Sequence, residues 1–292
     1  DAVTQAHLRK IRPHGIWRGG SKGWEFPFAA AKSLQEQLGS RFLVQEELCK
    51  WFSWLDQPLP PLPSHHDLVK QADLDHVLVD GRKPLPHQQS GARWLLARRG
   101  ALLADEMGLG KTMTALLAAR GMVRCSDVRV MVVAPVGLHL HWKREARAVG
   151  ISIDLQSWAS LPRELSSGGT VLLVDEAHFG QSLKARRTQA LLRLARHPRL
   201  RAIWMLSGTP MKNGRPSQLY PLLAAIEHPI ASDKLAFEQN FCQGHWRDQC
   251  GRRIWDCSGA SNLDQLRYLV RPLILQRFKD RLLDLPPKRR KK

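Results

Sequence analysis

Residues 102–112 read Leu-Leu-Ala-Asp-Glu-Met-Gly-Leu-Gly-Lys-Thr, an apolar run followed by a glycine-rich turn and a lysine. The apolar run favours a strand, and the composition of residues 113–120 favours a helix directly after the turn. Gly108 and Gly110 allow backbone N–H groups to close on a phosphate group. We therefore predict a phosphate-binding loop between a strand and a helix.

The last two residues of this stretch carry the loop's chemistry. Lys111 can reach the β and γ phosphates of a nucleotide, and Thr112 can hold its magnesium ion. The general pattern has glycine where this chain has Asp105, so the loop departs from the strict form. The alternative, a glycine-rich turn without a ligand, is disfavoured by the flanking strand and helix. The residues predicted to contact ATP and Mg²⁺ are Asp105, Glu106, Met107, Gly108, Leu109, Gly110, Lys111, Thr112 and Met113.

A second motif lies at residues 171–178, which read Val-Leu-Leu-Val-Asp-Glu-Ala-His. An apolar strand ends here in two carboxylates. We predict that Asp175 binds Mg²⁺, directly or through water, and that Glu176 polarises the attacking water. An acidic pair after a strand can also simply cap a helix. Its position downstream of the phosphate loop favours catalysis, with Lys111, Asp175 and Glu176 as the catalytic residues.

A third motif, Leu-Ser-Gly-Thr-Pro at residues 206–210, closes another apolar run. Ser207 and Thr209 are small hydroxyl residues that can bridge a nucleotide site and a nucleic-acid track. Alone, such a pentapeptide is more often a turn. After the first two motifs we interpret Ser207 and Thr209, together with His178, as coupling residues.

The pattern of the chain predicts an α/β fold. Helical patterns alternate with short apolar runs from about Pro84 onward, which indicates a parallel sheet with helices on both faces. In such sheets ligands bind at the carboxyl ends of the strands. The apolar runs are 101–104, 128–134, 151–155, 171–174 and 202–206.

The N-terminal part has a different character. Residues 15–26 have strand-forming residues around a glycine-rich turn, and 29–38 have a helical composition, so we predict a hairpin and a helix. The proline-rich run 57–63 indicates a stiff linker. The predicted domains are a small α+β module at 1–50, a linker at 51–82, the main α/β domain at 83–288 and the start of a further linker at 289–292.

The charge of the chain narrows its partners. The 292 residues include 45 Lys+Arg against 26 Asp+Glu, a net charge of +19. This suits nucleic acid first and an anionic membrane surface second. The sequence has no apolar run approaching the roughly 18 residues that span a bilayer, and no secretory signal. We expect an intracellular protein without a membrane partner. The expected compartment is bacterial cytoplasm or nucleoid, which the short spacings between motifs favour, or the nucleus in a eukaryote.

The five cysteines do not indicate a disulfide framework, because their number is odd and they are scattered. Four residues in one stretch offer zinc ligands, but their spacing fits no paired C-x-x-C pattern. We expect an ordinary loop without zinc. These residues are Cys242, His245, Cys250 and Cys257.

Together the three motifs resemble those of the Swi/Snf branch of superfamily 2 helicase-like ATPases. The motif sequences are typical of that branch at residues 105–112, 175–178 and 206–210. Residues 85–91 resemble its Q motif, whose glutamine recognises adenine, and this role maps to Gln88. The resemblance implies the first RecA-like lobe of a DNA-dependent ATPase, with ATP and Mg²⁺ as cofactors and DNA held by its backbone.

Ala134-Pro135, with Trp142 and Glu145, resembles motif Ia, which in the family lies against the nucleic-acid backbone. The resemblance implies phosphate contacts from Lys143 and Arg144. A solvated helix face is the alternative for these two residues.

Other segments are similar to the subgroup of HepA-related annealing helicases: 241–245, 255–263, 275–280 and 285–288. The N-terminal module resembles the HARP domain, which in that subgroup binds forked or single-stranded DNA. The DNA contacts implied there are Trp17, Arg18 and Trp24.

The chain also departs from the family pattern. Residues 179–181 read Phe-Gly-Gln where the family often has a lysine, and Phe278 stands where a threonine is common. We find no second lobe after Lys288, and hence no arginine finger, which in related systems is worth roughly 10³–10⁵ in rate. We therefore expect the chain alone to bind nucleotide weakly and to hydrolyse it barely.

Two other classes of function compete with an ATPase motor. One is a catalytically silent DNA-binding or scaffold module with a helicase-like fold, which the intact motif residues disfavour. The other is a small-molecule kinase, which has no use for Gln88 or for residues 206–210. The sequence leaves open whether the DNA is a fork, a duplex or a single strand, and whether it is annealed, remodelled or only tracked.

Overall fold

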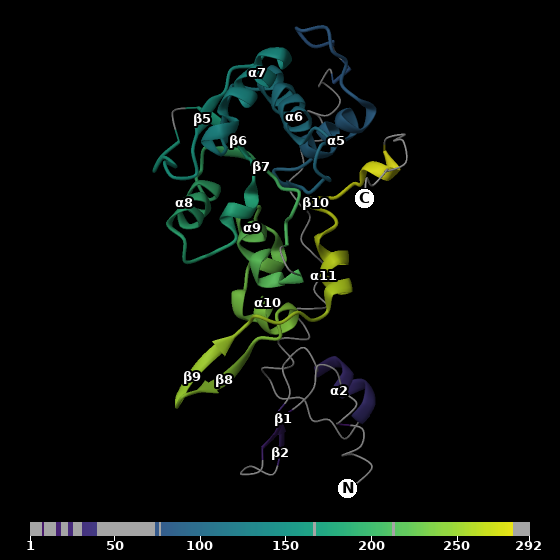
Figure 1. The fold of residues 1–292 in the computed structure, drawn as a ribbon, viewed down its shortest axis with the longest axis vertical. Coiled ribbons are helices and arrows are strands. Elements are labelled where there is room, and N and C mark those ends of the chain that lie inside the picture. The colour runs from purple at the N-terminus through teal and green to yellow at the C-terminus, as the bar shows by residue number, and fades with distance from the viewer. Residues whose placement is uncertain are drawn as a thin grey trace, which may run out of the picture. The chain divides into compact units, whose positions relative to one another are not determined.

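The computed structural model describes residues 8, 16–18, 23–25, 31–39, 74–75, 77–165, 168–211 and 214–282 (Figure 1). The chain divides into two compact units. Unit 1 comprises the described residues of 1–60, 211–220 and 229–269, and unit 2 those of 61–210, 221–228 and 270–292. The proline-rich run 57–63 and the basic C-terminal residues fall outside the described part of the chain.

Unit 2 is an α/β domain. Its helices are α5 (Pro86–Leu96), α6 (Lys111–Cys125), η3 (Val136–Leu138), α7 (His139–Val149), η4 (Ala177–Gly180), α8 (Arg186–Ala195), most of α9 (Tyr220–Ala225) and η8 (Lys279–Arg281). Its strands are β3 (Gly100–Leu103), β4 (Val128–Val133), β5 (Asp154–Gln156), β6 (Gly169–Val174), β7 (Leu200–Leu206) and β10 (Ile274–Leu275).

The six strands form one parallel sheet in the order β10-β3-β7-β6-β4-β5. Every residue of β3 and β6 is buried, which explains why these strands read as unbroken apolar runs. On one face, Leu103, Val132 and Trp204 belong to a core shared with α5, α6 and α7. On the other side of the sheet lie α8, which packs against β7, and α9 (Figure 1). The predicted parallel sheet covered by helices on both faces is confirmed.

The predicted elements differ from the structure mainly at their ends. Four of the five predicted strands overlap β3, β4, β6 and β7 to within two residues at each end. The fifth was predicted at 151–155 but pairs only from Asp154 to Gln156. Ile151 and Ile153 pack against the core without joining the ladder, so their apolar character reports burial rather than pairing. Strand β10 was not predicted.

Unit 1 holds smaller elements. They are β1 (Ile16–Arg18), β2 (Gly23–Glu25), α2 (Ala31–Leu38), η6 (Pro216–Gln218), η7 (Pro229–Ala231), α10 (Lys234–Phe241), β8 (His245–Gln249), β9 (Arg252–Asp256) and α11 (Leu263–Val270), whose last residue belongs to unit 2. Strands β1 and β2 pair antiparallel and place Trp17 opposite Trp24, so the predicted N-terminal hairpin and helix are present.

The cysteine-rich stretch spans the end of α10 and the hairpin of β8 and β9. Cys242 is buried and Cys250 is exposed, and both are free thiols, as is Cys257. Burial raises the pKa of the Cys242 thiol. Among residues that the structure describes, no group of three or more His, Cys, Asp or Glu side chains is arranged to hold a metal ion. Likewise, no described helix is both long and apolar enough to cross a membrane.

Candidate nucleotide site and arginine groove

The glycine loop joins the end of β3 to the start of α6. Gly108 and Gly110 have φ angles of +85° and +74°, in the left-handed region that favours glycine. The Nζ atom of Lys111, the first residue of α6, donates to the carbonyl oxygens of Asp105 at 2.8 Å and Glu106 at 3.3 Å. The loop therefore presents a helix N-terminus, backbone N–H groups and an ammonium group at one place, a combination that suits phosphate.

Helix α5, which carries the predicted adenine contact, lies against this loop. A ring nitrogen of His87 is 2.9 Å from the carbonyl oxygen of Leu109. The side-chain oxygen of Gln88 accepts a hydrogen bond from the Leu85 N–H at 3.0 Å. Its Nε2 atom lies so close to Gly110 that a Cβ there would collide with it. Gln88 and the phosphate loop are thus neighbours in the structure.

Asp105 is completely buried and paired with Arg277, a partner that sequence reasoning missed. Arg277 Nε lies 3.0 Å from Oδ1 of Asp105, and Nη2 lies 2.5 Å from Oδ2. The same guanidinium donates to the His87 carbonyl oxygen at 2.6 Å. The departure from glycine at this position therefore has a structural reason, since Asp105 supplies the counter-charge for a nearly buried arginine.

The acidic motif follows β6, and two tryptophans hold it. Trp142 Nε1 donates to Asp175 Oδ2 at 2.8 Å, and Trp158 Nε1 donates to the Asp175 carbonyl oxygen at 3.0 Å. The N–H of Glu176 donates to Asp175 Oδ1 at 2.9 Å. Glu176 itself has φ +47°, a conformation that costs of order 1–3 kcal/mol for a residue other than glycine. Strain of this kind is common where a side chain must be aimed.

The electrostatics show that the two motifs meet. Burial raises the pKa of Asp175, while the donors Trp142 and Glu176 N–H and the charge of Lys111 oppose that rise. Burial likewise lowers the pKa of Lys111, against the pull of Asp105, Glu176 and Asp175. Because β3 and β6 both flank β7 in a parallel sheet, their carboxyl ends face the same edge. Lys111, Asp175 and Glu176 lie within reach of one another's charge.

The third motif lies beside this pair. A Cβ added to Gly208 would lie 3.7 Å from Lys111 Nζ. Ser207 is buried and its Oγ accepts the Thr209 N–H at 3.2 Å. Gln181 Nε2, three residues after His178, donates to the Pro210 carbonyl oxygen at 2.8 Å and so ties the acidic segment to this loop.

His178 lies close to one of the catalytic candidates, Glu176. Its Nδ1 atom lies 3.0 Å from Glu176 Oε2, the separation of an ion pair without the alignment of a hydrogen bond. Its ring centroid is 4.6 Å from that of Phe179. All three predicted coupling residues therefore belong to the two segments that border Lys111.

The residues present fit a magnesium nucleotide. The hydroxyl of Thr112 and the carboxylate of Asp175 are oxygen donors, which magnesium prefers. Thr112 is the second residue of α6, at the same helix N-terminus as Lys111. The glycines keep the loop free of side chains where a triphosphate would lie against the backbone.

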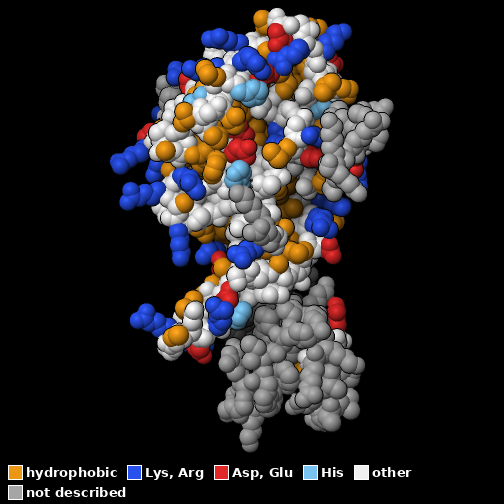
Figure 2. Space-filling model, viewed as in Figure 1, with side chains coloured by type: hydrophobic (Ala, Val, Ile, Leu, Met, Phe, Trp, Pro, Cys, Tyr) orange, Lys and Arg blue, Asp and Glu red, His pale blue; other side chains and the backbone are white. Residues whose placement is uncertain are grey.

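A groove of about 850 Å³ opens on the same edge of the sheet, and sequence reasoning missed it. It is bordered by Pro135 after β4, Trp158 after β5 and Phe179 after β6. Among the described residues that line it, the charged side chains are four exposed arginines, Arg163, Arg186, Arg187 and Arg193. Figure 2 shows Lys and Arg side chains along the side of unit 2 where α8 lies in Figure 1.

Two of these arginines occupy an unfavourable place in their helix. Arg186 and Arg187 open α8, whose first turn has no acidic residue. Positive charge at a helix N-terminus opposes the helix dipole, typically by about 0.3–1 kcal/mol. Arg187 also donates to the Phe179 carbonyl oxygen at 2.7 Å, with its guanidinium 5.6 Å from the centroid of that ring. An anionic ligand in the groove would offset this cost.

The groove and the acidic motif share Trp158. Its ring borders the groove, its N–H donates to Asp175, and it meets Phe179 edge to face at 6.1 Å. One side chain, Trp158, therefore contacts both the groove and the backbone of the acidic motif.

Two of the predicted DNA contacts, Lys143 and Arg144, lie outside the residues that line the groove. Lys143 and Arg144 are exposed on α7, and neither borders the groove. Arg144 lies 3.4 Å from Glu145, which is buried and paired with Arg82 at 3.0 Å. Trp17, Arg18 and Trp24 are described only by their backbone, in β1 and β2.

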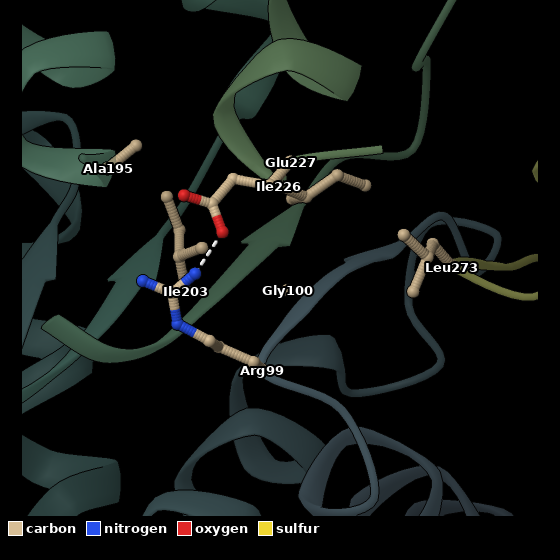
Figure 3. Close-up of a pocket in the computed structure, with 7 residues that line it drawn as sticks. All are labelled: Arg99, Gly100, Ala195, Ile203, Ile226, Glu227 and Leu273. Carbon is tan, nitrogen blue, oxygen red and sulfur yellow. Dashed lines mark hydrogen bonds and ion pairs between the residues drawn. The ribbon is translucent and has the colours of Figure 1, made fainter. Parts of the chain in front are cut away.

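A second cavity, at the amino end of β3, is not a nucleotide site. It measures about 60 Å³ and lies between β3, β7 and the ion pair of Arg99 with Glu227 (Figure 3). Pockets for small molecules typically measure about 300–1,000 Å³. The cavity is far below that range and lies at the opposite end of β3 from the phosphate loop.

The parallel sheet, the phosphate loop and the acidic motif together define a helicase-like ATPase lobe. The SNF2-related domain family matches residues 45–159 and 156–292. The chain belongs to this family, as the motifs predicted.

Three proteins illustrate the relatives. The mouse "DNA annealing helicase and endonuclease ZRANB3" is 30% identical over 242 residues, 72% of this chain and 22% of that protein. The bovine "SWI/SNF-related matrix-associated actin-dependent regulator of chromatin subfamily A-like protein 1" is 31% identical over 254 residues, which are 75% of this chain and 25% of that protein. Its Caenorhabditis elegans homolog is 30% identical to this chain over 273 residues, which are 80% of this chain and 38% of that protein. The chain thus spans between 22% and 38% of the length of these relatives.

Among solved structures, the chain is similar to the Sulfolobus solfataricus SWI2/SNF2 ATPase core, solved in complex with double-stranded DNA. The TM-score is 0.52 at 18% identity, over 76% of this chain and 47% of that one. At this identity the likeness concerns the fold, and it agrees with the RecA-like lobe that the motifs imply.

Proposed function

We propose that this chain is the ATP-binding lobe of a DNA-dependent ATPase that moves along DNA. The observation that carries the proposal is the meeting of Lys111 with Asp175 and Glu176 at the carboxyl edge of the sheet. Gln88 lies beside the same loop, where it can select adenine. The names of the relatives, which include annealing helicases, support DNA as the substrate.

In this proposal each residue has a chemical role. Lys111 and the loop N–H groups bind the β and γ phosphates, and Thr112 and Asp175 hold Mg²⁺. Magnesium supplies positive charge that offsets the charge of the phosphates. Glu176, aimed by its left-handed backbone, orients and polarises the attacking water.

The arginine groove is the proposed DNA track on this lobe. No carboxylate is among the described residues that line it with these four guanidinium groups, so the backbone phosphates of DNA are the matching partners. Contacts of this kind position a nucleic acid without reading its sequence, which suits a translocating motor. Lys143, Arg144 and the N-terminal residues Trp17, Arg18 and Trp24 remain proposed additional contacts.

Coupling between nucleotide and DNA would pass through two routes. Trp158 joins the groove to the Asp175 backbone, and His178 joins Phe179 in the groove to Glu176. On the nucleotide side, Ser207 and Thr209 lie in the loop beside Lys111. We further propose that efficient turnover needs a second RecA-like lobe with its arginine, so the chain alone hydrolyses ATP slowly.

The proposal is tested by replacing Lys111 with alanine in the full-length protein. DNA-stimulated ATP hydrolysis should fall to background, because the phosphates lose their charged ligand. DNA affinity without nucleotide should stay within about twofold of the parent, because Lys111 lies outside the groove. Hydrolysis at the parent rate would refute the site. Loss of DNA binding together with the circular dichroism signal would indicate unfolding, in which case Lys111→Met replaces the variant.

A further inference from the structure

Residues 273–279 run alongside β3 and then alongside the phosphate loop. The N–H of Ala104 donates to the Leu275 carbonyl oxygen at 2.7 Å, and that of Glu106 donates to the Arg277 carbonyl oxygen at 2.9 Å. Further on, the N–H of Lys279 donates to Glu106 Oε2 at 2.8 Å. Strand β10 therefore continues as an extended strap that runs beside the loop as far as η8.

Arg277 fixes this strap to two other segments. Its guanidinium binds the buried Asp105 carboxylate in the loop and the His87 carbonyl oxygen on α5. A planar guanidinium with a bidentate carboxylate is a rigid pairing. Lys279, two residues further along the strap, is tied to the loop by its own N–H, which donates to Glu106 Oε2.

The Lys279 ammonium lies at the glycine turn. A Cβ added to Gly108 would lie 2.8 Å from its Nζ atom. The side chain is partly buried and, within the described residues, it has no carboxylate partner. Its charge also lowers the pKa of Lys111, so the two ammonium groups share one small region. The carboxylates of Asp105, Glu176 and Asp175 act on Lys111 in the opposite direction, and Lys279 adds a second positive charge at the loop.

We propose that Lys279 is a second phosphate-binding lysine of the nucleotide site, brought to the loop by the strap. This inference rests on the proposed function, because it takes the phosphates of the nucleotide as the anion. It adds a residue that lies about 170 positions downstream of the loop motif and that the motif does not contain. A bound nucleotide would then contact both the loop and the strap, and would hold the two together.

The test uses Lys279→Gln, with Arg281→Gln as the matched control. Arg281 lies in the same short helix, η8, and is exposed. Affinity for a fluorescent ATP analogue and for competing tripolyphosphate is measured at equilibrium. Lys279→Gln should weaken both by about tenfold, the scale of one charge-assisted hydrogen bond. Arg281→Gln should leave both unchanged, and Lys279→Arg should restore most of the loss.

Two outcomes separate this inference from the proposed function. If Lys111→Ala abolishes binding while Lys279→Gln binds like the parent, Lys279 is not a phosphate ligand and the nucleotide site stands. If the parent protein binds no nucleotide at all, the proposed function fails first. Thermal melting without nucleotide should be equal for Lys279→Gln and the parent, since no carboxylate of the described residues pairs with this side chain. A lowered melting temperature with unchanged tripolyphosphate affinity would show a structural role and overturn the proposal.

Discussion

Asp175 has to be ionised to hold magnesium, yet its surroundings oppose ionisation. Burial raises its pKa, and the Trp142 N–H is the strongest single group that counters this rise. The carboxylate is therefore lost, as pH falls, at a higher pH than for an exposed aspartate. The acid side of the activity profile should reflect this titration.

Replacing Trp142 with phenylalanine tests whether the titration of Asp175 sets the acid limb of the activity profile. The carboxylate loses a donor that stabilises its charged form, so its pKa should rise and the acid limb of kcat/KM should move to higher pH. Trp158→Phe is the control, because Trp158 donates to the backbone oxygen of Asp175 rather than to its carboxylate. The full-length protein is assayed across the acid range. An unmoved limb in Trp142→Phe, or an equal shift in both variants, would argue against the assignment.

At the scale of elements, α8 carries the case for the DNA track. Its first two residues are arginines at the positive end of the helix dipole, where their charge opposes the dipole. The double variant Arg186→Gln with Arg193→Gln should weaken DNA binding. The slope of the logarithm of the association constant against the logarithm of the salt concentration should become shallower by about two, one for each lost phosphate contact.

The matched control removes two arginines away from the groove. Arg129 lies near the amino end of β4 and Arg271 follows α11, and both side chains are exposed. In the control both are replaced by glutamine. The double control has the same net charge as the α8 variant. Equal loss of affinity in the two variants would mean that total charge, not the groove, governs binding.

The sequence predicted much of the fold, and most of the residues that the structure brings together at the candidate nucleotide site. Glycine, lysine and carboxylate residues at strand ends indicate their chemistry locally, and apolar runs reveal buried strands. It did not predict β10, because two residues have no readable period. The pair of Asp105 and Arg277 was also missed, since two residues 172 positions apart give no local signal. The groove was missed for a similar reason, because its walls come from separate segments that follow β4, β5 and β6 and from α8.

At the scale of the whole molecule, the sheet brings all these parts to one edge. The phosphate loop, the acidic motif and the groove all follow the carboxyl ends of parallel strands. The chain's charge of +19 matches a phosphate-rich partner. Because the chain spans between 22% and 38% of the length of the three relatives named above, motion along DNA stays a proposal.

The central claim is that the glycine loop and the acidic motif form one magnesium-nucleotide site. The most direct measurement is a titration of residues 1–292 with an ATP analogue, with and without Mg²⁺, for the parent and for Asp175→Asn. Magnesium should tighten binding to the parent, and this gain should be largely absent in Asp175→Asn, while binding without magnesium stays similar. An equal gain from magnesium in both proteins would contradict the claim.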